Sequence, residues 1–398
     1  MGLGKTYTGA EKLNQLGGKI NIVICQKSKI DDWVDHFKTH YSYHVFDLTK
    51  PKELSNFLGQ CAGKRFKIVG IINYDIIFRR PDLSRIQIDT LLLDESSLIQ
   101  NESAKRSSFI LKMLSFHNII LLSGTPTNGK YENLWSQIHL LGWNISKDLY
   151  WKQYIVTEWQ DYDGFPQQVV KGYKNVDRLK TKLREHGAQF LKTEEVLNLP
   201  EQIEQIIKLP TTKEYRKFRK DLVVEIEGET LVGDNTLTQM LYERQLCGHY
   251  NALKLQAFED LVQSTNDRLI VFYNFKAEAQ ALIHIANEND RPWSIVSGDQ
   301  KTLAAYENYD NSITFIQYQA GAMGLNLQLA NKLIYFTLPL GKGSCGLWEQ
   351  SKKRIHRIGQ NNTCFYYYLL CRNSIEERNL EMLKLGRDLT DELFVESR

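Results

Sequence analysis

Gln350-Ser-Lys-Lys-Arg-Ile-His-Arg-Ile-Gly-Gln360 is the stretch of this sequence that first indicates a fold. It carries two arginines, Arg354 and Arg357, and on a helix this i, i+3 spacing would put both guanidiniums on nearly one face. Arginine keeps its charge at any working pH and forks onto phosphate oxygens. The stretch therefore predicts a site that holds an anion with directional charge.

The other end of the chain indicates which anion. It opens with Met1-Gly-Leu-Gly-Lys-Thr6, the second half of a loop that cradles nucleotide phosphates through Gly2, Gly4 and their neighbours. Lys5 would reach the β- and γ-phosphates, and Thr6 would hold Mg²⁺ through its hydroxyl. The loop's first glycine position and the preceding strand would lie upstream, so we expect a longer native chain or an internal start. Phosphate-handling segments at both ends indicate two domains that face one nucleotide.

Composition places the chain among ordinary globular proteins, with 42% hydrophobic and 24% charged residues over 398 positions. No apolar run approaches the ~20 residues that span a bilayer, and the N-terminus has no apolar signal segment. The six cysteines form no Cys-x-x-Cys pair, which favours reduced thiols. We therefore expect a cytoplasmic protein. The net charge of +3 is weak, so a nucleic-acid partner would need locally concentrated charge.

Short apolar runs alternate with amphipathic segments in two series, which predicts an α/β fold with parallel sheets and helices on both faces. Between the series, residues 146–250 are rich in Lys, Glu and Gln and predict a mainly helical insertion and connection. We therefore divide the chain into residues 1–145, 146–250 and 251–398. The predicted strands are Ile20–Cys25, Phe66–Ile72, Thr90–Leu93, Asn118–Leu122, Arg268–Tyr273, Pro292–Val296, Ser312–Tyr318, Lys332–Leu338 and Thr363–Cys371.

Leu91-Leu-Leu-Asp-Glu95 is an apolar strand that ends in two carboxylates. In phosphate-loop ATPases such a strand end supplies an Asp for the Mg²⁺ shell. We assign Asp94 to magnesium and Glu95 to the attacking water; the alternative is a solvated strand end.

Two glycine-containing turns follow other strands. Ser123-Gly-Thr-Pro126 places Ser123 and Thr125 where hydroxyls could relay between a nucleotide and a bound polymer, although turn formers alone explain the pattern. In Gln319-Ala-Gly-Ala-Met-Gly-Leu-Asn326, glycines such as Gly324 allow close backbone approach to a ligand or phosphate. A plain strand-to-helix turn explains that segment equally well.

In this order, the motifs resemble those of a helicase superfamily-two ATPase of the Snf (sucrose non-fermenting, chromatin-remodeller-like) family, with His356-Arg-Ile-Gly-Gln360 the most specific string. The resemblance implies two RecA-like lobes and ATP-driven translocation along double-stranded DNA. It implies that the four lobe-one residues Lys5, Thr6, Asp94 and Glu95 serve ATP and Mg²⁺. It also implies that Arg354 and Arg357 reach the nucleotide from lobe two, with Gln350 nearby and Arg357 the first choice as arginine finger.

The sequence departs from the family pattern at Asp94-Glu-Ser-Ser97, where Asp-Glu-Ala-His is usual. Loss of the histidine removes a contact between the nucleotide cleft and lobe two, which makes coupling to movement less certain than hydrolysis. The short insertions resemble bacterial or phage members, which implies the cytoplasm of a bacterial cell or of a phage-infected host.

DNA contacts are expected from Lys27, Ser28, Lys352 and Lys353, in addition to the two hydroxyl residues of the Thr-Pro turn. A merely solvated basic face is the alternative for any single lysine. Because phosphate contacts do not read bases, binding should be independent of sequence and should weaken with salt. We expect a monomer, with protein partners open.

Three functions remain open from the sequence. The first is a duplex-stimulated ATPase that translocates for DNA remodelling, replication or repair. The second is a strand-separating helicase on branched DNA, single strands or RNA. The third is a nucleic-acid-binding scaffold with a degenerate ATP site, which the intact Lys5, Asp94, Glu95, Arg354 and Arg357 disfavour.

Overall fold

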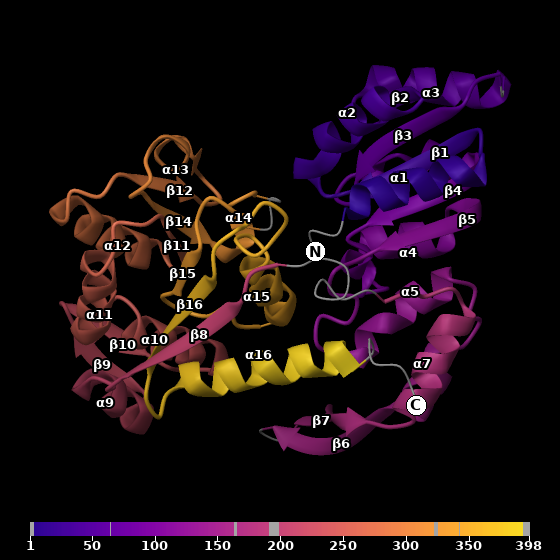
Figure 1. Ribbon diagram of the computed structural model, residues 1–398. Helices are drawn as coiled ribbons and strands as arrows, with labels where there is room; N and C mark the ends of the chain where they lie inside the picture. Colours follow the sequence, from indigo (N-terminus) through magenta and orange to yellow (C-terminus); the bar gives the residue numbers. More distant parts are fainter. Residues whose placement is uncertain are drawn as a thin grey trace. The chain divides into compact units, whose positions relative to one another are not determined.

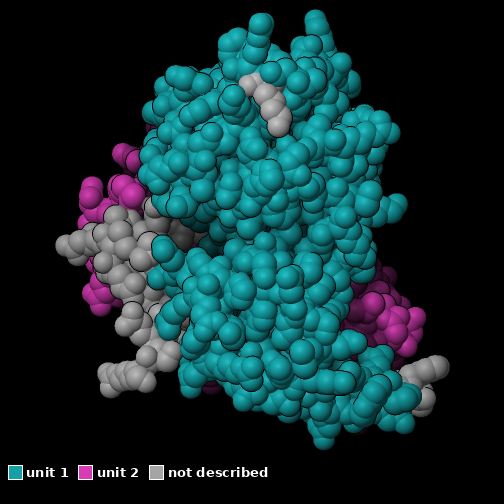
Figure 2. All heavy atoms as spheres, turned by 90° about the vertical axis from the view of Figure 1, so that its right-hand side faces the viewer, with its two compact units in different colours: residues 1–196, 388–398 teal, residues 197–387 magenta. Residues whose placement is uncertain are grey.

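The computed structural model describes residues 4–63, 65–162, 165–190, 199–321, 325–341 and 343–392. The chain divides into two compact units, shown in different colours in Figure 2. Unit 1 comprises Met1–Val196 with Asp388–Arg398, and unit 2 comprises Leu197–Arg387. Each unit is built on its own parallel sheet, as the alternating pattern predicts.

The sheet of unit 1 has five parallel strands in the order β2-β3-β1-β4-β5. Every residue of β1 and β3 is buried, which is why these strands read as unbroken apolar runs rather than alternating ones. The strands are β1 (Ile20–Cys25), β2 (His44–Asp47), β3 (Ile68–Asn73), β4 (Gln87–Asp94) and β5 (Ser115–Leu122).

Helices cover both faces of this sheet (Figure 1). Side chains of α1 and α2 share one core cluster with Val23 and Leu92, whereas α3 and α4 share another with Ile22 and Leu91. Adjacent strand residues thus serve opposite faces. The helices are α1 (Lys5–Leu16), α2 (Ile30–His40), α3 (Pro51–Gly63) and α4 (Lys105–Lys112).

The rest of unit 1 packs around a separate aromatic cluster that includes Tyr131, Tyr150 and Tyr154. It contains two short helices before an antiparallel hairpin and one helix after it. These elements are α5 (Trp135–Leu140), α6 (Lys147–Tyr154), β6 (Ile155–Tyr162), β7 (Phe165–Tyr173) and α7 (Val176–Glu185).

The sheet of unit 2 has seven strands in the order β13-β12-β14-β11-β15-β16-β8, and only the short β13 runs antiparallel to its neighbour. The edge strand β8 comes from the predicted connection and pairs along the whole length of β16. The strands are β8 (Gln202–Leu209), β11 (Leu269–Tyr273), β12 (Trp293–Val296), β13 (Lys301–Thr302), β14 (Ile313–Gln317), β15 (Lys332–Tyr335) and β16 (Cys364–Cys371).

Around this sheet lie helices and a small hairpin of β9 (Val223–Ile226) and β10 (Glu229–Val232). The helices are α9 (Lys213–Asp221), α10 (Thr236–Cys247), α11 (Ala252–Gln263), α12 (Lys276–Glu288), α13 (Ala304–Asn308), α14 (Tyr318–Gly321), α15 (Ser344–Lys352) and α16 (Ile375–Glu392).

The stretch 146–250, predicted as a mainly helical insertion and connection, contains strands as well as helices. Its first part belongs to unit 1 and its last part to unit 2. The sequence did not predict the hairpin strands, because polar residues interrupt their apolar ones, as in Thr157–Gln160. Whether this stretch behaves as a separate domain stays a prediction.

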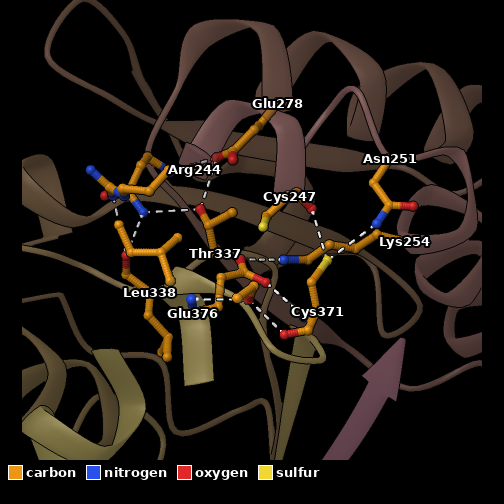
Figure 3. A network of polar contacts seen from close by, with 12 residues as sticks. Arg244, Cys247, Asn251, Lys254, Glu278, Thr337, Leu338, Cys371 and Glu376 are labelled. Carbon is orange, nitrogen blue, oxygen red and sulfur yellow. Dashed lines mark hydrogen bonds and ion pairs between the residues drawn. The ribbon is translucent and has the colours of Figure 1, made fainter. Parts of the chain in front are cut away.

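A buried polar network ties the carboxyl ends of β15 and β16 to the surrounding helices (Figure 3). The Lys254 ammonium on α11 lies 2.5 Å from the Glu376 carboxylate on α16, and both are nearly inaccessible. The other oxygen of Glu376 accepts from the Cys371 N–H. On α12, the Glu278 carboxylate accepts from the Thr337 hydroxyl. These bonds anchor three helices to the carboxyl edge of the sheet.

Two further expectations concern the cysteines and the membrane. All six cysteines are buried free thiols, as predicted. Among the helices that the structure describes, none combines the length and the apolar character needed to cross a bilayer.

Candidate functional site

The beginning of α1 has the backbone geometry of a phosphate site. Gly4 caps the helix with φ of +68°, in the left-handed region that favours glycine. Lys5 and Thr6 form the first turn, whose N–H groups have no carbonyl partner within the helix. Such a helix start attracts anions. Gly2 lies outside the described residues.

Lys5 and Glu95 meet although they are 90 positions apart in sequence. The Lys5 ammonium donates to Glu95 Oε1 at 2.6 Å, and the second oxygen, Oε2, is buried without a hydrogen-bond partner. Glu95 has φ of +53°, a conformation that costs a non-glycine residue free energy and that gathers at functional sites. The structure therefore confirms that the two side chains lie together.

Asp94, the last residue of β4, is held by two aromatic residues that the sequence analysis did not single out. The Trp33 indole N–H donates to Asp94 Oδ2 at 3.1 Å, and the Tyr74 hydroxyl donates to the Asp94 carbonyl at 2.9 Å. Burial raises the pKa of Asp94, although the charge of Lys5 opposes that shift. The protein thus keeps a costly carboxylate in place. The sequence feature that could have indicated Trp33 is its place as an aromatic residue in the helix that follows the first strand.

These residues fit a nucleoside triphosphate with Mg²⁺. The first turn of α1 and the Lys5 ammonium supply donors for phosphate oxygens. Asp94, Glu95 and the half-buried Thr6 hydroxyl supply the oxygen ligands that Mg²⁺ prefers. The buried Glu95 Oε2 has no hydrogen-bond partner, so it can accept a hydrogen bond from a bound water or contact a cation.

Ser96 links the acidic pair to the Thr-Pro turn. Its hydroxyl donates to Gln137 Oε1 at 2.8 Å, and Gln137 Nε2 donates to the Pro126 carbonyl at 2.7 Å. Thr125 is only 4% exposed, and its N–H donates to Ser123 Oγ. Thr125 therefore faces the interior, against the expectation of a nucleic-acid contact.

Lys27 and Ser28 remain candidates for DNA contact. Both are exposed in a short 3-10 helix, Lys27–Lys29, that directly follows the carboxyl end of β1. Ligands of open α/β sheets bind at this edge.

Lys352 does not lie where a DNA contact requires it. It is 7% exposed, its ammonium is ion-paired with Glu204 of β8, and it lies 4.1 Å from the centroid of the Trp348 ring. The sequence did not predict this ion pair, because Lys352 lies in a basic run and its carboxylate partner is 148 positions away in sequence. Lys353, at the end of α15, is half-buried.

The two arginines do not share a helical face, because α15 ends at Lys352 and residues 353–359 form turns. Arg354 is 7% exposed. Arg357 is half-buried, its guanidinium donates to Asn326 Oδ1, and burial lowers its pKa. Gln350 is half-buried on α15.

Much of the specific string 350–360 holds this loop in shape. The Gln360 amide donates to the carbonyls of Gln328, Ala330 and Ile355, and His356 Nε2 lies 2.8 Å from the Pro200 carbonyl. These bonds fix the loop that carries Arg357 against the segment after Asn326. Gly324 lies outside the described residues.

A comparison with protein families adds the identification. The SNF2-related domain family matches residues 1–252, well over half of the chain. The chain belongs to the SNF2-related family. This confirms the resemblance and agrees with two parallel-sheet α/β units.

Curated relatives match over most of the chain. The yeast ISWI chromatin-remodeling complex ATPase ISW1 is 22% identical over 96% of this chain and 37% of its own length. The Bacillus subtilis putative ATP-dependent helicase/translocase YwqA is 23% identical over 79% of this chain and 36% of its own length. Human ZRANB3, a DNA annealing helicase and endonuclease, is 24% identical over 81% of this chain and 31% of its own length. The chain thus spans about a third of their length.

Among solved structures, the Sulfolobus solfataricus SWI2/SNF2 ATPase core in complex with dsDNA is 18% identical. It covers 99% of this chain and 86% of its own, with a TM-score of 0.41, too low to carry an argument.

Proposed function

We propose that unit 1 binds ATP with Mg²⁺ and hydrolyses it, and that the chain uses this energy to move along duplex DNA. The observation that supports it best is the meeting of Lys5, Asp94 and Glu95 beside the glycine-capped start of α1. Membership of the SNF2-related family supports the same reading.

In this mechanism the groups of unit 1 divide the work. Lys5 and the N–H groups of α1 hold the phosphates, while Thr6 and Asp94 hold Mg²⁺, which when bound neutralises charge on the phosphate oxygens. Glu95 orients the attacking water and takes its proton as the water oxygen bonds to the γ-phosphorus and the bond to ADP breaks. ATP must first draw Lys5 away from Glu95 for both to act.

From unit 2, Arg357 is proposed to stabilise the charge of the transferring phosphoryl group, with Arg354 and Gln350 in support. The half-buried Arg357 carries a pKa lowered by burial, so its environment disfavours the bare cation and would favour an anionic partner. An arginine in this role contributes about 10³–10⁵ in kcat in other nucleotide hydrolases.

Duplex DNA is the proposed partner, with phosphate contacts that include Lys27 and Ser28, the exposed residues after β1. The similarity to a chromatin-remodeling ATPase and to a DNA annealing helicase supports a DNA substrate for this chain. Ser123 and Lys353 stay secondary candidates.

The decisive experiment measures ATP turnover with no polymer, duplex DNA, single-stranded DNA or RNA. We expect duplex DNA to raise kcat most, and Glu95→Gln to lower kcat by about 10²–10⁴ while retaining ATP binding. Preference for single strands or RNA would move the proposal to a strand-separating helicase. Equal rates with and without polymer would contradict the translocase proposal.

A separate variant tests the arginine finger. Arg357→Ala should lower kcat strongly and change the KM for ATP less. Unchanged turnover would assign the arginine-finger role to Arg354 instead.

A further inference from the structure

Helix α9 of unit 2 carries a dense row of positive charge. Its sequence, Lys213-Glu-Tyr-Arg-Lys-Phe-Arg-Lys-Asp221, holds five cations in nine residues. Four of them, spaced i, i+3, i+4 and i+7, line up along one helical face. We call these four the α9 stripe: Lys213, Arg216, Lys217 and Lys220.

The opposite face of α9 anchors the helix to its unit. Tyr215 and Phe218 are buried, the Tyr215 hydroxyl donates to Glu243, and the Ile375 N–H donates to that hydroxyl. The fifth cation, Arg219, is tied to the same side, because it donates to the Asn373 carbonyl. All four residues of the α9 stripe are therefore turned outward, and each is exposed.

In the described part of the chain, no ion pair holds a side chain of the stripe. Within the described ranges, none of its four side chains has a carboxylate oxygen within 4.0 Å, whereas Lys208, Arg268, Lys276 and Lys332 of the same unit all have one. Like charges at i+3 and i+4 destabilise a helix by about 0.2–0.5 kcal/mol per pair. A cation in the first turn, Lys213, also opposes the helix dipole. Lys220 lies in the last turn of α9, where a cation is favourable, and Glu214 lies in the first turn. These effects offset the repulsion, so the stripe is a charged surface of a stable helix.

We propose that the α9 stripe binds the phosphate backbone of duplex DNA as a contact surface of unit 2; this rests on the proposed function. The stripe extends about 10 Å along the helix, a length over which duplex DNA presents about six charges. Arginine and lysine heads with no competing carboxylate suit phosphates and read no bases.

The test compares two double variants that remove the same charge. Arg216→Gln with Lys217→Gln removes the middle of the stripe. Lys301→Gln with Arg372→Gln removes one lysine and one arginine elsewhere on unit 2, both exposed and, among the described residues, both without a carboxylate oxygen within 4.0 Å. Duplex affinity is measured against salt concentration by fluorescence anisotropy. We expect the slope of log K against log salt to fall by about 2 in the stripe variant and to keep the wild-type value in the control.

Two further measurements exclude a folding effect. The stripe variant should melt close to the wild-type temperature, because Arg216 and Lys217 are exposed and glutamine forms helix as well as they do. A structural role would lower the melting temperature. Arg216→Lys with Lys217→Arg keeps both charges and should keep the wild-type slope. Equal slopes in the stripe variant and the control would overturn the α9 stripe while leaving duplex-stimulated ATP turnover, and so the proposed function, intact. Wild-type protein that does not bind duplex DNA would overturn both.

Discussion

At the scale of single residues, the candidate site contains carboxylates that lower the stability of the free protein. Asp94 and Glu95 are adjacent carboxylates at the end of a buried strand; one has a pKa raised by burial and the other has a left-handed backbone. Lys5, Trp33 and Tyr74 offset part of these costs in the free protein. Sites with such uncompensated groups gain stability when their ligand binds.

Asp94→Asn should therefore raise or preserve the stability of the ligand-free protein and abolish its response to Mg²⁺ with ATP. A carboxylate whose folded pKa is raised costs stability as pH rises from its unfolded pKa through its folded pKa, and the amide lacks that cost. Thermal unfolding between pH 4 and pH 8, with and without Mg²⁺ and a non-hydrolysable ATP analogue, measures both effects. A large loss of stability in the free variant would contradict the assignment.

At the scale of elements, most residues in and after the end of α15 make structural contacts, and few are left open to a ligand. Gln360 and His356 bind backbone carbonyls, Lys352 neutralises Glu204, and Arg357 keeps a partly open position. In unit 1, Ser96 and Gln137 connect the acidic pair to the Thr-Pro turn through two hydrogen bonds.

Gln360→Ala should lower stability by about 1–3 kcal/mol, because it leaves buried carbonyls without donors. It should also lower kcat, since the loop that carries Arg357 loses its anchor to the segment 328–330. Chemical denaturation and steady-state turnover report the two effects. Ile358→Ala is the matched control, because Ile358 is 57% exposed in the same loop and its truncation should leave stability within about 0.5 kcal/mol. An unaltered unfolding midpoint for Gln360→Ala would exclude the anchoring role.

At the scale of the whole molecule, the described side chains form core clusters that belong to one unit or the other. The clusters around Ile22 and Val23 lie in unit 1, and those around Phe272 and Val271 lie in unit 2. Units with separate cores can unfold in separate transitions. The buried Lys254–Glu376 pair lies entirely in unit 2.

Glu376→Gln should accordingly lower the free energy of unfolding of unit 2 by about 3–5 kcal/mol, because the Lys254 ammonium is left buried without its countercharge. The unfolding transition of unit 1 should stay unchanged. Lys254→Met combined with Glu376→Leu should recover most of this loss. Differential scanning calorimetry resolves the transitions, and the ATP analogue, bound by unit 1, should raise the transition that the variant spares. Equal shifts of both transitions would refute separate unfolding.

The sequence by itself determined what local patterns encode: two α/β series, buried parallel strands, and carboxylates at the end of β4. These follow from apolar runs, glycine and charge within a few residues. Only the tertiary structure decided which side chains meet. It paired Lys5 with Glu95 and Asp94 with Trp33, and it buried Lys352 against Glu204. It also placed Arg354 and Arg357 in turns after α15 rather than on one helical face, and it left the α9 stripe exposed. Partners tens to over a hundred positions apart set the charge and burial of each group, and no local pattern contains that information.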